Sequence, residues 1–290
     1  MSLSFFSYTD ADLRLMPKRS AESNKGSYGR VLCVCGSVGM CGAAYLAAKA
    51  AYRTGAGLVR ILTVNENLIP LQASLPEAII TVYDKNAPDA KTVLSAIEWA
   101  DAVVVGCGLG THRSARSILS TVLRYTEVPT VVDADALNVI ASNDGLEKYL
   151  RGKIITPHPL EASRLTGIPV EQIMADTADV ARDFSQKHGA VCAIKRHETV
   201  VSDGSERVYV NKSGNSGMAT AGSGDVLAGI IGGILAQSKD NCLGAMQAAC
   251  LGVYIHGLCG DVAARELGEY SLMASDIIDA LPSVLKKIQN

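Results

Sequence analysis

Short runs of apolar, β-branched residues recur along the chain, and most lead through glycine or polar residues into a segment with helical spacing. This alternation is typical of a mainly parallel sheet with helices on both faces. Strands are predicted at Val31–Cys35, Leu58–Val64, Ala102–Val105, Thr130–Val132, Lys153–Thr156, Val191–Lys195, Thr199–Ser202 and Arg207–Val210. Helices are predicted over Ala43–Thr54 and Val170–His188, with three more after Gly222, and Asp203-Gly204 is predicted to join the last two strands as a turn.

The pattern indicates a single domain. No Pro/Ser linker, charge block or internal repeat divides the chain, so residues 29–290 are expected to fold together after a lead-in over residues 1–28. A chain of 290 residues can bury a core without disulfide or metal staples. In open α/β sheets, ligands bind beyond the carboxyl ends of the strands. The residues that follow each strand are therefore the first candidates for a functional site.

Composition narrows the class of protein. Apolar residues make up 48% of the chain and charged residues 19%, which excludes a disordered chain and favours strands and helices buried on several sides. The 27 basic and 29 acidic residues give a net charge of -2, which is no footprint of a nucleic-acid binder. The segment Cys242–Gly260 lacks charged residues but contains four glycines, which predicts a buried helix instead of a membrane span.

The cysteines indicate a reducing compartment. None forms a CxxC pair and most have apolar neighbours, so they are interpreted as small buried hydrophobes rather than zinc ligands or disulfides. Asp10 and Asp12 interrupt what would be the apolar part of a secretory leader. We therefore expect a cytoplasmic protein. The cysteines stand at positions 33, 35, 41, 107, 192, 242, 250 and 259.

The most informative segment is the glycine-rich run Asn215–Asp225, which leads into a predicted helix. The first N–H groups of a helix lack intrahelical acceptors and, together with the helix dipole, suit a phosphate or a developing oxyanion. Gly222, Ser223 and Gly224 would form such an anion hole. Asp225 would lie in the first turn, where the dipole favours its ionised form, and could accept a proton from a substrate hydroxyl. Alternatively, the glycines only make a tight turn and Asp225 only caps the helix.

Two earlier glycine loops are less specific. Gly36, Gly39 and Gly42 have neither the spacing of a dinucleotide-binding fingerprint nor the Lys-Ser/Thr of a P-loop. They allow the backbone to approach either a ligand or a neighbouring strand, and their spacing does not decide between the two. The loop Gly106–Gly110 is open to the same two interpretations, although its position directly after a predicted strand favours ligand contact.

Polar residues follow three other predicted strands. Asp133 and Asp135, with Asn138 nearby, could hold Mg²⁺ through water or could cap the next helix. His158 stands between two prolines that fix the backbone, so it is either a positioned binding residue or a structural histidine. The segment Lys195–Thr199 could bring cations to a nucleotide phosphate, or its charges could simply be solvated.

Together these segments resemble the ADP- or ATP-dependent NAD(P)H-hydrate dehydratase family, within the ribokinase-like superfamily. The resemblance runs from about Gly29 to Leu281 and implies an α/β fold, a ribokinase-like three-layer α/β/α sandwich with a mainly parallel central sheet. Members of this family repair NADHX and NADPHX, the hydrated and redox-inactive forms of the reduced nicotinamide cofactors. The most specific segments are Gly36–Gly57, Val132–Asn138, Thr156–Glu161 and Asn215–Gly233.

The resemblance also implies roles for individual residues. Asp225 would be the catalytic base and would contact the hydrated cofactor together with Ala43, Gly108 and His158. Family members often have glycine where this chain has Arg196, so the backbone of this loop is expected to differ from theirs. The residues that would contact the adenine nucleotide are Gly224, Lys195, Arg196, His197, Glu198 and Thr199.

The implied reaction is dehydration of the S epimer of NADHX and NADPHX, with ADP or ATP as phosphoryl donor and release of AMP or ADP and phosphate. ADP is the expected donor, and Mg²⁺ would neutralise the nucleotide phosphates; no metal ligands are assigned. The family implies a homo-oligomer, expected to be a tetramer. Because only a short segment precedes Gly29, epimerisation of NAD(P)HX is expected to come from a separate protein.

Two other functions are compatible with parts of this pattern. A small-molecule kinase of the same superfamily would use the glycine loop and Asp225 equally well, although Val132–Asn138 and Thr156–Glu161 match the dehydratase pattern more closely. A non-catalytic nucleotide-binding protein is the third hypothesis. The intact loop and Asp225 argue against it.

Overall fold

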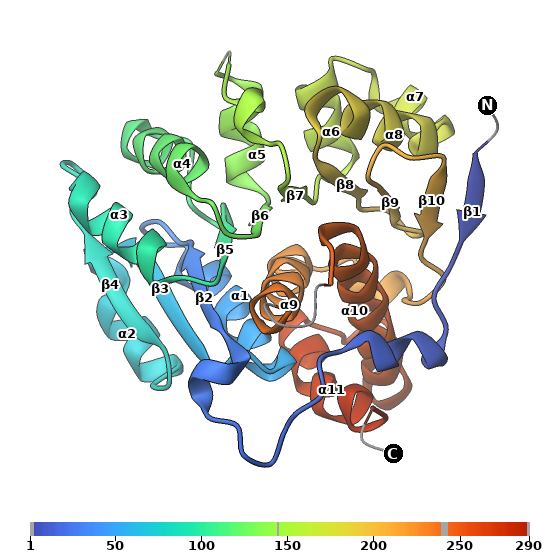
Figure 1. Ribbon diagram of the computed structural model, residues 1–290, viewed down its shortest axis with the longest axis horizontal. Coiled ribbons are helices and arrows are strands. Elements are labelled where there is room, and N and C mark those ends of the chain that lie inside the picture. Colours follow the sequence, from blue (N-terminus) through green and yellow to red (C-terminus); the bar gives the residue numbers. More distant parts are fainter. Residues whose placement is uncertain (1–2, 144, 239–242, 289–290) are drawn as a thin grey trace.

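A ten-stranded sheet runs through the centre of the computed structural model, which describes residues 3–143, 145–238 and 243–288 (Figure 1). Its strand order is β1-β10-β9-β8-β7-β6-β5-β2-β3-β4. Among these strands, every neighbouring pair is parallel except for the two pairs that β9 makes with β8 and β10. The predicted mainly parallel sheet is confirmed. The strands are β1 Ser4–Phe6, β2 Arg30–Val34, β3 Leu58–Val64, β4 Ile79–Tyr83, β5 Ala102–Val105, β6 Thr130–Val132, β7 Ile154–Ile155, β8 Val191–Ile194, β9 Val200–Ser202 and β10 Arg207–Val210.

Helices cover both faces of the sheet and complete the predicted three layers (Figure 1). One layer holds α1, α2, α9, α10 and α11, and the other holds α3 to α8. Each layer encloses its own apolar core against the sheet. The helices are α1 Cys41–Thr54, α2 Leu68–Ser74, α3 Ala90–Trp99, α4 Arg113–Tyr125, α5 Asp135–Ala141, α6 Pro159–Thr166, α7 Val170–Ala175, α8 Thr177–His188, α9 Ser223–Gln237, α10 Ala245–Leu267 and α11 Ala274–Lys286.

The structure departs from the sequence prediction in three elements. Strand β4 was not predicted; it is an edge strand that is only partly buried. Strand β1 lies within the segment expected to be a lead-in, where it pairs in parallel with β10 and packs the Phe6 ring on Tyr209. The predicted helix Val170–His188 is wrong in one respect. Asp176, at φ -124° and ψ 41°, leaves the helical conformation and separates α7 from α8.

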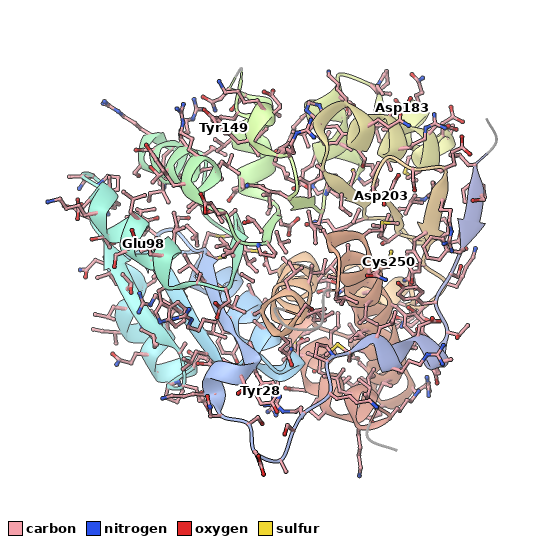
Figure 2. All side chains as sticks on the ribbon, viewed as in Figure 1. Tyr28, Glu98, Tyr149, Asp183, Asp203 and Cys250 are labelled. Atoms are coloured by element: carbon pink, nitrogen blue, oxygen red, sulfur yellow. The ribbon has the colours of Figure 1, made fainter. Side chains whose placement is uncertain are left out.

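The charge-free segment Cys242–Gly260 forms most of α10, as predicted, although Cys242 itself lies outside the described residues. The residues from 248 to 255 are all buried. No helix within the described residues is both long and apolar enough to cross a bilayer. Cys250 lies on the inner side of α10 (Figure 2). Of the seven cysteines that the structure describes, all are free thiols and six are buried, which agrees with their interpretation as small hydrophobes.

Helix α9 is the most enclosed helix, lying between α1, α10 and the sheet (Figure 1). Glycine makes this close packing possible. A Cβ atom built on Gly229 would lie 2.2 Å from the carbonyl oxygen of Ala47 in α1, and one built on Gly232 would lie 2.4 Å from Cγ2 of Val104 in β5. The alanine-rich face of α1 completes the contact, because small side chains let the two helix backbones approach. The position of α9 is therefore fixed by sterics on two sides.

This packing predicts that Gly229→Ala destabilises the protein although alanine is the better helix former. Overpacking of a core costs about 1–3 kcal/mol, which exceeds the gain of about 1 kcal/mol in helix propensity. Urea unfolding followed by circular dichroism measures the difference. Gly42→Ala in α1 is the matched control, because a Cβ there meets nothing within 4 Å and stability should stay the same or rise. Equal stability of the two variants would show that α9 and α1 can move apart freely.

Candidate active site

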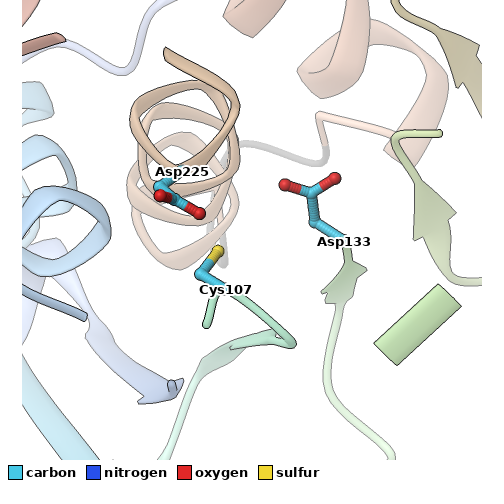
Figure 3. Close-up of side chains that lie close together, drawn as sticks. All are labelled: Cys107, Asp133 and Asp225. Carbon is cyan, nitrogen blue, oxygen red and sulfur yellow. The ribbon is translucent and has the colours of Figure 1, made fainter. Parts of the chain in front are cut away.

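Three side chains from separate elements meet beyond the carboxyl ends of the central strands. Cys107 follows β5, Asp133 follows β6, and Asp225 lies in the first turn of α9. The Cys107 sulfur and one carboxylate oxygen from each aspartate all lie within 4.8 Å of one another. Figure 3 shows the two carboxylates directed toward each other above the thiol. The site therefore forms at the sheet edge where the topology predicted it.

Asp225 reaches this position because α9 begins abruptly. Gly222 is the N-cap residue at φ 89°, in the left-handed region, and a Cβ there would lie 2.5 Å from Cδ1 of Leu46. Within the described residues, the N–H groups of Gly224 and Asp225 have no acceptor. Ser223 was predicted to belong to the anion hole, but its N–H already donates to the Thr220 carbonyl at 3.3 Å. Two free donors thus point out of the helix beside the Asp225 carboxylate, which is the arrangement expected of an anion hole.

Asp133 is held by the backbone around it. A Cβ on Gly106, at φ 121°, would lie 1.9 Å from the carbonyl oxygen of Asp133, so only glycine lets the two loops touch. The next residue, Ala134, has φ 52° and is the one non-glycine residue with positive φ in the described part of the chain. Such strain persists only where its surroundings enforce it and is concentrated at functional sites.

Lys195 connects Asp133 to the first turn of α6. Its Nζ lies 2.6 Å from Oδ1 of Asp133 and 4.0 Å from Oε2 of Glu161. Both carboxylates are almost fully buried, with Asp133 1% and Glu161 4% exposed. A Cβ on Gly224 would lie 3.2 Å from the same Nζ, so the lysine also borders the start of α9. The ammonium group is therefore placed to meet an anion bound at the helix terminus.

His158 has the structural role that the sequence left open, while its role as a binding residue stays a prediction. It is the N-cap of α6, where its Nδ1 accepts hydrogen bonds from the N–H groups of Leu160 and Glu161. Glu161 completes the capping box by accepting from the His158 N–H at 2.8 Å. The imidazole nevertheless keeps 45% of its surface exposed, with its Nε2 3.3 Å from Oε1 of Glu161. Burial, together with Lys195, lowers the pKa of His158 and favours the neutral ring.

Electrostatics at the site are set by two buried acids, Asp133 and Glu161, the partly buried Asp225, and Lys195. Burial and the Asp133 carboxylate raise the pKa of Asp225 to about 7, whereas the helix dipole alone predicted a readily ionised group. Burial likewise raises the pKa of Glu161. Burial alone would lower the pKa of Lys195, but Asp133 and Glu161 raise it. The pKa of Asp225 thus lies near neutral pH, which is the range that suits a general base.

The predicted pair of Asp133 and Asp135 is replaced by Asp133 and Asp225. Asp135 turns away and accepts a hydrogen bond of 2.8 Å from the Gly110 N–H, while Asn138 accepts from Arg164 at 2.6 Å. Neither carboxylate caps α5, whose N-cap residue is Ala134. The alternative of a side-chain cap is therefore wrong. Asp135 instead anchors the loop Gly106–Gly110 against α5.

The remaining predicted residues lie on two sides of this centre. Ala43 and Gly108 are in contact, since a Cβ on Gly108 would lie 2.8 Å from the Ala43 Cβ. Arg196 extends away from the site and donates to the Met174 carbonyl and the Thr177 hydroxyl. Glu198 pairs with Lys212 at 2.6 Å, so its carboxylate is also engaged outside the centre. His197 is exposed, whereas Thr199 is at the limit of burial.

Cys107 and Glu161 were not among the predicted site residues. Cys107 lies inside a glycine loop that was recognised only by its glycines, and a single cysteine in such a loop carries no signal of its own. An interaction with Cys35, together with burial, keeps the pKa of its thiol well above the ordinary value, so it is a neutral neighbour of Asp225. Glu161 had a detectable signal, because it stands three residues after His158 at the spacing of a capping box.

The sequence model described as NAD(P)H-hydrate dehydratase matches residues 31–283, which include every residue of this centre. The chain belongs to the NAD(P)H-hydrate dehydratase family. The predicted resemblance is thereby confirmed. A relative from Neisseria meningitidis, described as ADP-dependent (S)-NAD(P)H-hydrate dehydratase, is 41% identical over 90% of this chain and 86% of its own length.

Other members of the family differ in length. A bifunctional NAD(P)H-hydrate repair enzyme from Coxiella burnetii is 41% identical over 97% of this chain but only 57% of its own length. The chain spans about half the length of the bifunctional relatives it matches. Among solved structures, the ADP/ATP-dependent NAD(P)H-hydrate dehydratase of Bacillus subtilis, co-crystallised with ATP/Mg²⁺, superposes with a TM-score of 0.82 at 29% identity and covers 99% of both chains.

The buried ion pair predicts a stability defect for Lys195→Met. Removing the lysine leaves Asp133 buried without its partner, and breaking one side of such a pair costs about 3–5 kcal/mol. The double variant Asp133→Asn/Lys195→Met should recover much of this loss, because no unpaired charge remains. Urea unfolding of the wild type, both single variants and the double variant measures the coupling. Additive losses in the double variant would contradict the pairing.

Proposed function

We propose that this protein catalyses the ADP-dependent dehydration of the S epimer of NADHX and NADPHX, releasing AMP and phosphate. The observation that carries the proposal is the position of Asp225. Its carboxylate, with a pKa raised to about 7, stands beside two free N–H groups and within reach of the Lys195 side of the site. The name of the Neisseria relative supports the choice of ADP and of the S epimer. The Bacillus enzyme is named for both nucleotides, so ATP is tested alongside ADP.

The chemistry begins at a hydroxyl on a saturated ring carbon of the substrate, which is a poor leaving group. Asp225 accepts its proton while the oxygen attacks the terminal phosphorus of the nucleotide. The N–H groups of Gly224 and Asp225 stabilise charge on the moving phosphoryl group, and Lys195 faces the same space. The lone pair of the ring nitrogen then expels phosphate to give an iminium ion, and loss of a proton from the neighbouring ring carbon, which the departing phosphate can accept, restores the dihydropyridine. The reaction is a lyase reaction with a phosphoryl transfer as its first step.

The two substrates are assigned to opposite sides of Asp225. The nucleotide lies against Gly224 and the loop Lys195–Thr199, which follows β8. The hydrated ring lies against Ala43, Gly108 and His158. The sheet order supports this division for Lys195 and Gly108, since β8 and β5 lie on either side of β6 and β7, whereas His158 follows β7 and stands between the two sides.

Mg²⁺ is expected to accompany the nucleotide, and the residues present suit it. Carboxylate oxygens are its preferred protein ligands, and those of Asp133 and Asp225 lie within 4.8 Å of each other. The neutral Cys107 thiol is too soft a donor for this ion. We assign Asp133 as the residue that would hold the ion through water, which leaves Asp225 free to accept the proton. When bound, Mg²⁺ would neutralise charge on the nucleotide phosphates.

The wider setting of the enzyme is also a proposal. We infer a homotetramer in the cytoplasm, in line with the free thiols at all seven described cysteines. Epimerisation of the R form is assigned to a separate protein. Sedimentation analysis measures the oligomer, and incubation with R-NADHX alone tests whether this chain leaves that epimer unchanged.

A recovery assay tests the dehydratase directly. The protein is incubated with S-NADHX or S-NADPHX, Mg²⁺ and either ADP or ATP, and the return of absorbance at the wavelength of the reduced nicotinamide is followed. We expect recovery with one phosphate released per molecule repaired. No recovery with either nucleotide would remove the proposal. A stable phosphorylated product would instead indicate a kinase of the same superfamily.

The Asp225→Asn variant should lose activity by about 10²–10⁴-fold, the usual contribution of a general base. Stability should not suffer at pH 8. The pKa of Asp225 is raised from 3.8 to about 7 in the folded state, so the free energy of unfolding falls as the pH rises from the lower value to the higher. At pH 8 this loss is complete in the wild type, and asparagine, which does not ionise, avoids it. Asp183→Asn on the surface of α8 is the matched control (Figure 2) and should retain full activity. Retained activity in Asp225→Asn would refute the assigned base.

The pH profile provides an independent check. With ADP saturating, kcat/KM for the hydrate should fall about tenfold per pH unit below about 7, because the protonated carboxyl of Asp225 cannot accept a proton, and should level off above it. In Asp133→Asn this fall in kcat/KM should begin at lower pH, because loss of the neighbouring negative charge lowers the pKa of Asp225. A fall that is unmoved in this variant would show that another group controls the profile.

A further inference from the structure

A second feature of the site lies beyond the residues that the proposed reaction uses. A cavity of about 700 Å³ opens beyond the carboxyl ends of β2, β3 and β4, against the start of α4. Ser37, Val64, Lys85, His112, Arg113 and Ser117 are among the residues that line it. None of them has a role in the phosphoryl transfer.

One loop of the chain leads from the catalytic centre to the border of the cavity. Cys107 begins the loop beside Asp225, and Gly110 ends it at the cavity. A Cβ built on Gly110 would lie 3.2 Å from the His112 ring and 3.7 Å from the Ser37 hydroxyl oxygen. Adjacent strands lie about 4.8 Å apart, so the end of β3 is about 10 Å from the end of β5. A dinucleotide with one end at Asp225 can place its other end here.

The sheet order shows which substrate the cavity faces. Three places follow one another along the carboxyl edge of the sheet. Lys195 follows β8, the carboxylates of Asp133 and Asp225 stand near β5 and β6, and the cavity lies beyond β2, β3 and β4. In Figure 1, β8 lies on one side of the molecule and β2, β3 and β4 lie on the other, with β5 and β6 between them. The phosphoryl donor occupies the Lys195 side in the proposed reaction. The cavity is therefore on the side of the hydrated cofactor.

The lining favours an anionic and partly aromatic occupant. Arg113 is exposed and has no hydrogen-bond or ion-pair partner in the described part of the chain, and no acidic side chain lines the cavity. Lys85 pairs with Glu66 at 2.6 Å, but both side chains are about two-fifths exposed, and such surface pairs contribute little. Lys85 can therefore turn to a stronger anion. Serine hydroxyls suit ribose and phosphate oxygens, and Val38, Val64 and Pro88 offer an apolar surface to a base.

We propose that this cavity binds the adenosine-phosphate end of the hydrated dinucleotide, with Arg113 and Lys85 contacting its phosphate groups, the 2′-phosphate of NADPHX included. The inference rests on the proposed dehydratase function. Guanidinium forms paired hydrogen bonds with phosphate, and such charge-assisted bonds are among the strongest in proteins. The enzyme should accordingly prefer NADPHX to NADHX.

Kinetics of the Arg113→Ala variant test the assignment. We expect kcat/KM for NADPHX to fall about tenfold or more and that for NADHX to fall less, while KM for ADP stays unchanged. Lys85→Ala should act in the same direction. Arg124→Ala is the matched control. Arg124 is in the last turn of the same helix, where it stacks on Tyr149 and does not line the cavity. Unchanged discrimination between NADPHX and NADHX in Arg113→Ala would overturn the proposal.

A binding measurement separates this inference from the proposed reaction. Adenosine 2′,5′-bisphosphate is titrated calorimetrically into the protein with ADP saturating, so that the donor site is filled. We expect binding to the wild type and to Arg124→Ala, and a loss of about tenfold or more in affinity in Arg113→Ala. If the wild type shows this pattern but repairs neither hydrate, the cavity stands as an adenosine-phosphate site and the reaction is wrong. If the wild type repairs the hydrates but does not bind the bisphosphate, the cavity assignment is wrong.

Discussion

The burial of helix α9 is the constraint on which the rest of the site depends. A helix enclosed by α1, α10 and the sheet can present no bulky side chain toward its neighbours, which is why Gly229 and Gly232 stand at its closest contacts. Its axis is consequently fixed by backbone and small side chains, with little freedom to tilt. Its first turn must therefore lie at the carboxyl edge of the sheet, with Asp225 beside the loops that follow β5 and β6. A rigid, buried element thus places the carboxylate that accepts the substrate proton in the proposed reaction.

The same burial sets the chemistry of that group. Three acids share a poorly solvated space with Lys195, and the lysine lies closest to Asp133. Asp225 is left with the smallest compensation, so desolvation and the neighbouring charge hold its pKa near 7. The helix dipole, which favours ionisation, is outweighed. A carboxylate that is more basic than a surface aspartate accepts a proton more readily, and the fold supplies this property without a separate histidine or lysine as base.

Much of this arrangement was predictable from the sequence. The two signals that predict it, an apolar run and the polar residues directly after it, both lie within a short stretch of chain. Apolar runs predicted eight of the ten strands, and the polar residues after them lie at one edge because parallel strands end together. The two missed strands, β1 and β4, are edge strands with partly exposed residues, so their patterns are weak. The partnership of Asp133 with Lys195 joins residues 62 positions apart, and that of Asp133 with Asp225 joins different layers. No spacing rule reports such contacts. Asp133 was paired with Asp135 because the two are close in sequence, and sequence distance does not show which side chains meet in space.

The near-neutral charge of the chain acquires a physical meaning from this geometry. In the proposed reaction two polyanions bind to a protein with a net charge of -2, so the attraction cannot come from the field of the whole surface. The structure offers local donors instead: free N–H groups at the start of α9, Lys195 inside the centre, and Arg113 in the lining of the cavity. Each acts within a few ångströms, and each lies on a different stretch of the same sheet edge. Backbone and single side chains at fixed positions distinguish one end of a substrate from the other, which a uniformly basic surface would not do.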